Sequence, residues 1–303
     1  MRTQIPFAVL AVAFACTFAT APAHARARVF VASYGNDANP CTFGSLCKTF
    51  QVAISAVDAG GEVTAIDSAG FGPIIINKSV TITSPLGVEA GIVPTSGANA
   101  INIAALSTDK VTLRGLTIDG ANSGLNGIGV SSVGVLEIDG CVIRNFTEHG
   151  ISYTPGNATT LVIHNTVTSL NGGEGVFINP GDALKATIDN VVATNNQSDG
   201  ILISGPATTA TVSNSVFSNN VDFGLLAEGA AKAMVSNSVV SSNGADGLIA
   251  SGASATLRVT KTTITGNLTG WAADSSAVLE SFGDNSLRGN TTDGTPTATV
   301  SLK

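Results

Sequence analysis

Four short segments decide the fold of this chain: GVFINPG at 175–181, GILISG at 200–205, GLLAEG at 224–229 and GLIASG at 247–252. Each begins with Gly, continues with apolar residues typical of a short strand, and ends with residues typical of a turn. The same start recurs along the chain in steps of 23 to 25 residues. A fixed period of this length indicates a stacked repeat architecture. The series comprises Gly127, Gly150, Gly175, Gly200, Gly224, Gly247, Gly270 and Gly294.

A second strand and two Asn series keep the same period. The second strand is led by Leu113, Ile138, Ile163, Ile188, Val212, Val235, Val259 and Phe282. The Asn series are Asn165, Asn190, Asn214 and Asn237, and Asn171, Asn196, Asn220, Asn243, Asn267 and Asn290. In stacked parallel turns, equivalent residues lie about 4.8 Å apart, so Asn amides can form ladders. We expect the repeat glycines to supply bends with positive φ. The pattern predicts an all-β parallel β-helix of about nine or ten turns.

The open ends of such a coil need caps, and the chain offers a candidate for each. Residues 48–58 predict an amphipathic helix with Phe50, Ile54 and Val57 on one face, followed by two Gly. The polar segment 291–303 is a candidate for the other end. We therefore divide the chain into a signal peptide at 1–25, an N-terminal cap at 26–61, and the β-helix with its C-terminal cap at 62–303.

The N-terminus indicates export. Arg2 precedes an apolar run at 5–19 and the small-x-small sequence Ala23-His24-Ala25, as in a secretory signal peptide. We expect a secreted, periplasmic or cell-surface protein without a membrane span in its mature part. Cys41 and Cys47 lie close together in sequence and predict a disulfide, because a metal pair would need a second ligand pair nearby. We expect Cys141 to be a buried free thiol.

The repeats over 76–294 and the opening VFVASYGNDANPCTFGSLCKTF at 29–50 resemble a known family. They are similar to the right-handed parallel β-helix repeat proteins of the pectin-lyase-like superfamily, of the type that bacteria secrete. The resemblance implies a right-handed coil. That family includes pectate lyases, polygalacturonases and many proteins of unknown activity, so the resemblance leaves the chemistry open.

A functional site on a β-helix is a column of equivalent positions on neighbouring turns. The strongest titratable column is Arg114, Asp139, His164 and Asp189. Its two Asp residues would lie about 9.6 Å apart, near the upper end of the roughly 6.5–9.5 Å found in inverting glycoside hydrolysis. His164 would then shuttle protons or bind sugar hydroxyls. The alternative, which we favour, is a surface ladder of compensating charges, because the Asp motifs of polygalacturonases are absent.

A second column directly precedes the Gly-led strands. It comprises Asn126, His149, Glu174, Asp199, Phe223 and Asp246. Glu174 and Asp199 on adjacent turns are weak candidates for a Ca²⁺ site, because calcium needs six to eight oxygens. The alternative is that they are solvated turn acids. We expect no other cofactor.

A third column is apolar and faces outward by alternation. Phe177, Leu202, Leu226 and Ile249 occupy it on four successive turns. It is either covered by a loop or by the C-terminal segment, or it is a surface for a partner or for a second copy. Trp271 and Tyr153 fall on inward positions, and we assign them to the core.

These observations favour a non-catalytic protein that presents a flat surface to a glycan or to a cell-surface partner. The net charge of −7 argues against nucleic acid and, on average, against polyanionic glycans. The first alternative is a polysaccharide lyase or glycoside hydrolase that works at the Arg114–Asp189 column. The second is a structural or adhesive protein that assembles into homo-oligomers through the Phe177 column.

Overall fold

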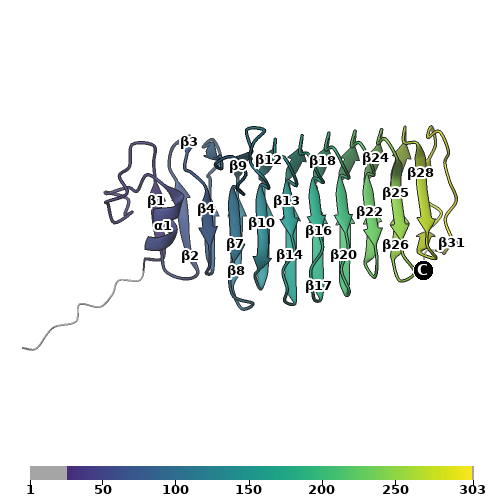
Figure 1. Ribbon diagram of the computed structural model, residues 1–303, viewed down its shortest axis with the longest axis horizontal. Coiled ribbons are helices and arrows are strands. Elements are labelled where there is room, and N and C mark those ends of the chain that lie inside the picture. Colours follow the sequence, from purple (N-terminus) through teal and green to yellow (C-terminus); the bar gives the residue numbers. More distant parts are fainter. Residues whose placement is uncertain (1–25, 302–303) are drawn as a thin grey trace, which may run out of the picture.

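The structure is a rod of stacked turns with one short helix at its N-terminal end (Figure 1). It is a computed structural model that describes residues 26–301, so the predicted signal peptide at 1–25 lies outside the described residues. Each complete turn contributes one strand to each of three sheets, and all strand pairs in them are parallel. The predicted right-handed parallel β-helix is confirmed.

The three sheets run the length of the rod. The twelve-stranded sheet contains β1 (Arg28–Val31), β2 (Gly61–Ala65), β5 (Val80–Thr83), β8 (Lys110–Arg114), β11 (Val135–Asp139), β14 (Thr159–His164), β17 (Leu184–Asp189), β20 (Thr208–Ser213), β23 (Lys232–Ser236), β26 (Thr256–Thr260), β29 (Val278–Ser281) and β31 (Ala298–Thr299). The nine-stranded sheet contains β4 (Ile74–Ile76), β7 (Ile101–Ala104), β10 (Ile128–Ser132), β13 (Ile151–Tyr153), β16 (Val176–Ile178), β19 (Ile201–Ile203), β22 (Leu225–Glu228), β25 (Asp246–Ser251) and β28 (Thr269–Asp274). The ten-stranded sheet contains β3 (Ala69–Gly70), β6 (Ala90–Ile92), β9 (Leu116–Asp119), β12 (Val142–Arg144), β15 (Val167–Ser169), β18 (Val192–Thr194), β21 (Val216–Ser218), β24 (Val239–Ser241), β27 (Thr263–Thr265) and β30 (Ser286–Leu287).

Alternation within the strands builds one continuous core. In β14 the first, third and fifth side chains are buried and the others are partly exposed, because successive residues point to opposite faces. The predicted lead positions stack in register from Leu113 to Val259 and are buried. Phe282 was assigned wrongly to this series, since Val259 pairs with Ser281 instead. The sequence repeat is less regular at this end of the rod, where no further complete turn follows.

The repeat glycines have a different role from the one predicted. Those at 127–270 do not have positive φ, and only Gly294 does, in the segment that follows the last turn. A Cβ on Gly247 would lie 2.6 Å from the carbonyl oxygen of Gly270 and 2.8 Å from Nδ2 of Asn267. Gly is therefore required because each turn approaches the next too closely for a side chain. The positive-φ bend falls instead to the outer Asn series, as at Asn165 with φ 50.

The inner Asn series forms the predicted amide ladder. Each Nδ2 donates to Oδ1 of the next Asn at 2.9–3.0 Å, and all but the last are buried. The ladder runs through Asn171, Asn196, Asn220, Asn243, Asn267 and Asn290. The outer Asn series does not form a continuous ladder. Asn190 donates to Asn165, but Asn214 donates to Asp189.

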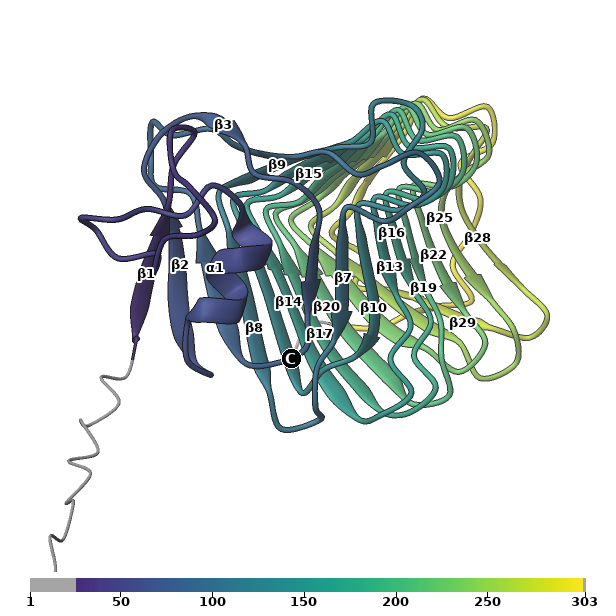
Figure 2. The same ribbon diagram turned by 60° about the vertical axis from the view of Figure 1, so that its left-hand side comes forward.

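Both ends of the rod are closed. Helix α1 (Phe50–Ala56) lies across the N-terminal end (Figure 2) and buries Phe50 and Ile54. It is shorter than the predicted 48–58, because Thr49 is its N-cap and Val57 its C-cap. At the other end, β31 adds to the twelve-stranded sheet, and the backbone N–H of Trp271 donates to the carbonyl of Asp293.

The cysteines are arranged as predicted. Cys41 and Cys47 form a disulfide in the loop before α1. Cys141 is free and fully buried, and burial raises the pKa of its thiol to about 12, so it stays protonated. Within residues 26–301, no helix is long and apolar enough to cross a membrane.

Candidate functional site

The column of Arg114, Asp139, His164 and Asp189 lies on the twelve-stranded sheet. Backbone register pairs each residue with the next, as predicted. His164 Nδ1 lies 3.9 Å from Asp189 Oδ2, a longer separation than in the other acid–base contacts among residues 26–301. Arg114 does not bond to Asp139 but to Glu137, at 2.8 Å, and Lys110 contacts the same carboxylate at 2.9 Å.

The charged groups of this column favour a structural role. Ser213 and Asn214 both donate to Oδ1 of Asp189 and hold the pKa of that carboxyl below its usual value. The hydrogen bond to Glu137 raises the pKa of Arg114. A general acid needs a raised pKa near the working pH, whereas Asp189 has a lowered one. The ladder of compensating charges stays our interpretation of this column, although Arg114 is compensated by Glu137 and not by Asp139.

The second column has a regular backbone role at the corner before the nine-stranded sheet. Asn99 Oδ1 accepts from the N–H of Asn126, and Asn126 Oδ1 accepts from the N–H of His149. Farther along, Asp199 Oδ1 accepts from the N–H of Phe223 at 3.0 Å. Each of these side chains thus caps the equivalent N–H of the next turn. Phe223 donates its backbone N–H to this pattern, but its side chain has no acceptor, so the series of capping side chains ends there.

Two carboxylates in this column have opposite environments. Glu174 Oε2 lies 2.5 Å from Nδ1 of His149, and Glu174 Oε1 accepts from the Ser198 hydroxyl at 3.2 Å. Burial opposes ionisation of Glu174, but the hydrogen bond and the charge of His149 outweigh it and lower the pKa of Glu174. His149 is held in turn by the ring of Phe177, which stacks on it at 4.7 Å.

Asp199, one turn farther on, has the opposite shift. Its side chain is 3% exposed, and burial raises its pKa to about 7 although the Phe223 N–H lowers it. The nearby charges of Glu174, Asp222 and Glu228 raise it further. Adjacent turns therefore carry one carboxylate that stays ionised and one that holds a proton near neutral pH.

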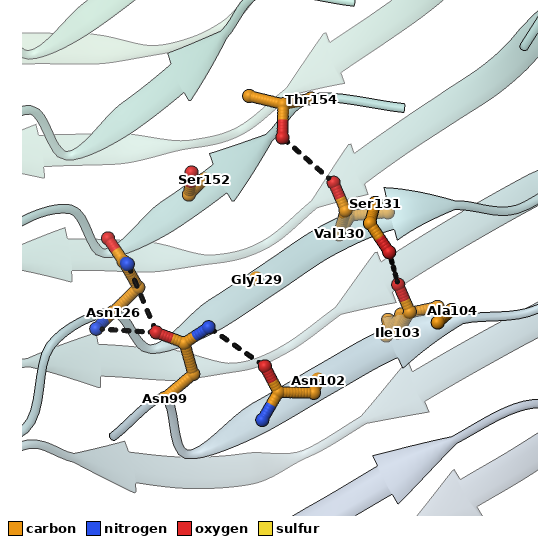
Figure 3. Close-up of a pocket in the computed structure, with 10 residues that line it drawn as sticks. All are labelled: Asn99, Asn102, Ile103, Ala104, Asn126, Gly129, Val130, Ser131, Ser152 and Thr154. Carbon is orange, nitrogen blue, oxygen red and sulfur yellow. Dashed lines mark hydrogen bonds between the residues drawn. The ribbon is translucent and has the colours of Figure 1, made fainter. Parts of the chain in front are cut away.

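A polar cavity of about 290 Å³ continues this column toward the N-terminal end (Figure 3). Asn99 donates from Nδ2 to Asn102 Oδ1 at 2.9 Å and accepts from Nδ2 of Asn126 at 3.0 Å. Gly129 forms the floor, where a Cβ would lie 2.4 Å from Asn99 Nδ2. The lining is uncharged and comprises Asn99, Asn102, Ile103, Ala104, Asn126, Gly129, Val130, Ser131, Ser152 and Thr154.

The predicted apolar column follows the same sheet but is less exposed than predicted. Register aligns Phe177, Leu202, Leu226 and Ile249 on successive strands. Leu226 and Ile249 are only 9% and 7% exposed, so atoms of the chain itself cover them. Half of the expected surface is therefore not available to a partner or to a second copy.

In the described part of the chain, no three His, Cys, Asp or Glu residues gather in a metal-binding group. Three of the four carboxylate oxygens of Glu174 and Asp199 are already engaged by protein groups. Tyr153 and Trp271 are buried in the core, as assigned. The sequence reasoning missed the aromatic residues that are exposed, Tyr34 and Phe43 in the cap.

The stacked turns, with a column of mostly polar side chains at one corner, define a right-handed parallel β-helix protein. A family model described as right handed beta helix region matches residues 149–302, so the chain belongs to this family. No curated protein matches the chain in sequence.

Several solved structures share this fold. The alginate lyase from Paenibacillus sp. str. FPU-7 has a TM-score of 0.66 at 17% identity, over 90% of this chain and 97% of that one. Pectate lyase Pel9A has a TM-score of 0.62 at 15% identity, over 84% and 74%. The A-module of the Azotobacter vinelandii mannuronan C-5 epimerase AlgE4 has a TM-score of 0.57 at 15% identity, over 80% and 91%. At sequence identities of 15–17%, these similarities show a shared fold and not a shared activity.

Proposed function

We propose that this protein is a glycoside hydrolase that cleaves a neutral polysaccharide at Glu174 and Asp199. One observation carries the proposal: the surroundings push the pKa values of these two neighbouring carboxyls apart. Such divergence is how enzymes assign an acid and a base among carboxylates. Solved structures of the same fold are named as lyases and epimerases of polysaccharides, which supports a sugar polymer as the substrate. The proposal moves the reaction centre away from the Arg114–Asp189 column.

The local charge favours a neutral substrate. Glu174, Asp222 and Glu228 already act unfavourably on a charge at Asp199, and they would repel the carboxylates of a uronate polymer in the same way. Elimination, the lyase reaction, requires the acidified C–H bond that a uronate carboxyl provides. A neutral sugar lacks that group, so its glycosidic bond is cleaved by hydrolysis.

In the proposed reaction each group has one role. Protonated Asp199 donates its proton to the glycosidic oxygen as the C–O bond breaks, and ionised Glu174 forms an ester with the anomeric carbon. Water then cleaves this ester and returns a proton to Asp199. The two residues stand at equivalent backbone positions on adjacent turns, about 4.8 Å apart, and we propose the retaining mechanism because it uses two carboxyls that lie close together. His149 is a positioning residue that keeps Glu174 ionised.

The cavity near Asn126 extends the same face by three turns, about 14 Å from the Asp199 position. Its amides and hydroxyls suit the hydroxyl groups of neighbouring sugars. A polymer aligned with the rod would therefore contact the cavity and the carboxylate pair together.

A second candidate is a non-catalytic glycan-binding protein. The low exposure of Asp199 and its bond to the Phe223 N–H favour it, because both are typical of a structural corner residue. In that case the same polar face binds sugar and no bond is broken.

The test is a cleavage assay on neutral and uronate polysaccharides that measures both new reducing ends and unsaturated products. We expect reducing ends from a neutral polymer, with activity that falls as the pH rises through about 7, where Asp199 loses its proton. Asp199→Asn and Glu174→Gln should each lower the rate by about 100-fold or more. Asp246→Asn, in the same column two turns beyond Asp199, is the control and should retain activity.

Two outcomes would contradict the proposal. Full activity of Asp199→Asn would remove the assigned acid, and unsaturated products from a uronate polymer would replace hydrolysis with elimination. Binding of a neutral polymer without any cleavage would support the second candidate.

A further inference from the structure

The cap loop, residues 32–47, carries the exposed aromatic side chains of the described chain. Tyr34 is 72% exposed and Phe43 is 74% exposed, while the other described aromatic residues are buried or half-buried. The Phe43 ring packs edge-on against Phe30 of β1, with ring centroids 5.5 Å apart. The loop projects at the N-terminal end of the rod, beside β1 (Figure 1). Two large rings are thus presented to solvent at one place.

These rings flank a cavity of about 350 Å³, a size typical of the smaller ligand sites. Its lining has no charged residue and combines aromatic faces with amide, hydroxyl and backbone groups. The lining residues are Tyr34, Gly35, Asn39, Phe43, Gly44, Ser45 and Leu46. An uncharged cavity of this kind suits a neutral ligand with apolar faces and hydroxyl groups.

The loop is held in place by several independent bonds. The Cys41–Cys47 disulfide closes it, and the carbonyl of Leu46 accepts from the N–H of Asn36 and from Nδ2 of Asn39. Asp37 Oδ1 accepts from the N–H groups of Lys48 and Thr49, which ties the loop to the start of α1. A site that is already ordered loses little conformational freedom on binding.

We propose that the cap loop is a second sugar-binding site, one that anchors a neutral polysaccharide away from the reaction centre. The C–H faces of sugar rings pack on Tyr34 and Phe43, and Asn39 and Ser45 reach the sugar hydroxyls. The inference rests on the proposed function, because it takes the neutral glycan of that function as its ligand. Six strand spacings separate β1 from β17, about 29 Å. The site therefore acts on polymers and not on short oligosaccharides.

The test is native gel electrophoresis with soluble mixed-linkage β-glucan, xylan or galactomannan cast into the gel, and with polygalacturonate as an anionic comparison. We expect a neutral polymer to retard the protein, and Tyr34→Ala and Phe43→Ala each to weaken binding about tenfold, as is typical of exposed aromatic anchors. Leu86→Ala is the matched control, because Leu86 is fully exposed on another turn. Circular dichroism and the disulfide content of each variant verify folding.

A second measurement separates this site from the reaction centre. Hydrolysis of the polymer should slow in the Tyr34 and Phe43 variants, while hydrolysis of a short oligosaccharide should continue at the parent rate. Unchanged polymer binding in both variants would overturn the cap site and leave Glu174 and Asp199 untouched. Binding restricted to polygalacturonate, or no polymer bound at all, would overturn it as well. If Asp199→Asn loses cleavage but still binds the polymer, the result tests the reaction centre and not the cap site.

Discussion

At the scale of single residues, position on the turn decides what a side chain does. Asp199 and Asp189 are both carboxyls that follow the same 24- or 25-residue repeat. Asp189 faces outward among hydroxyl and amide donors and has a lowered pKa, whereas Asp199 is buried at a corner and has a raised one. Their chemistry differs because burial penalises the charged form and hydrogen-bond donors favour it.

The raised pKa of Asp199 predicts a pH-dependent stability. Its pKa is about 7 in the folded chain and 3.8 in an ordinary environment, so between these values the folded state holds a proton that the unfolded state releases. The resulting stabilisation is present below about pH 4 and is lost as the pH rises to about 7. Asp199→Asn keeps an acceptor for the Phe223 N–H but cannot ionise. Relative to the parent, its free energy of unfolding should rise by on the order of 1–4 kcal/mol between pH 4 and pH 8.

Urea unfolding of the parent and of Asp199→Asn across this range measures the difference directly. Asp246→Asn serves as the control. A stability difference between parent and Asp199→Asn that does not change with pH would show that Asp199 ionises normally.

At the scale of elements, the Asn ladder holds the turns of the ten-stranded and nine-stranded sheets together. Asn220 Oδ1 accepts from the N–H and Nδ2 of Asn196, and its Nδ2 donates to the carbonyl of Ala193 and to Asn243. All of these groups are buried. The ladder therefore satisfies backbone groups that no strand pairing reaches.

Removal of one step of the ladder should be costly. Asn220→Ala leaves the buried N–H and amide of Asn196 without their acceptor, so we expect a loss of about 2–4 kcal/mol in the free energy of unfolding. Asn179→Ala, at an exposed Asn without a side-chain hydrogen bond among residues 26–301, should change it by less than about 0.5 kcal/mol. Denaturant unfolding measures both, and equal midpoints for the two variants would contradict a structural role of the ladder.

The sequence allowed most of these elements to be predicted, but not their chemistry. Periodicity assigned residues such as Leu113 and Asn220 to columns, because stacking repeats one environment on every turn. It did not distinguish bends from close contacts: the repeat Gly residues were predicted to supply bends with positive φ, but they allow the close approach of neighbouring turns, and the bends fall to the outer Asn residues. The depth of Asp199 and the contact of His149 with Glu174 depend on side-chain conformations that a repeat does not encode. Tyr34 and Phe43 lie outside the repeat, where no period indicates exposure.

At the scale of the whole molecule, the turns behave as interchangeable units. Residues 224–246 form one such unit, since Phe223 and Asp246 are equivalent positions before successive Gly-led strands. Each turn contacts mainly its neighbours, so the stability of the rod is approximately a sum over turns and their interfaces.

Deletion of 224–246 should therefore give a folded rod that is one turn shorter. The strands of all three sheets keep their register, and Asn220 meets Asn267 in the ladder. Deletion of 224–235 alone should not fold, because the inward and outward faces of every later strand would be displaced. Circular dichroism and thermal melting distinguish the two, and identical behaviour of both deletions would contradict the modular description.

The ends of the rod also govern how molecules behave toward one another. The outer edge of β1 is occupied, because Phe30 bonds through its N–H and carbonyl to Cys41 and Cys47 of the disulfide loop. At the other end of the same sheet the edge is β31, which has only two residues. The edge of β28 in the nine-stranded sheet is partly covered, because the backbone N–H groups of Gly270 and Trp271 bond to the carbonyls of Thr292 and Asp293. Short or covered edges deprive another chain of a backbone template. We therefore expect that the stacking of turns does not continue from one molecule to the next, so that these rods do not join end to end into fibres.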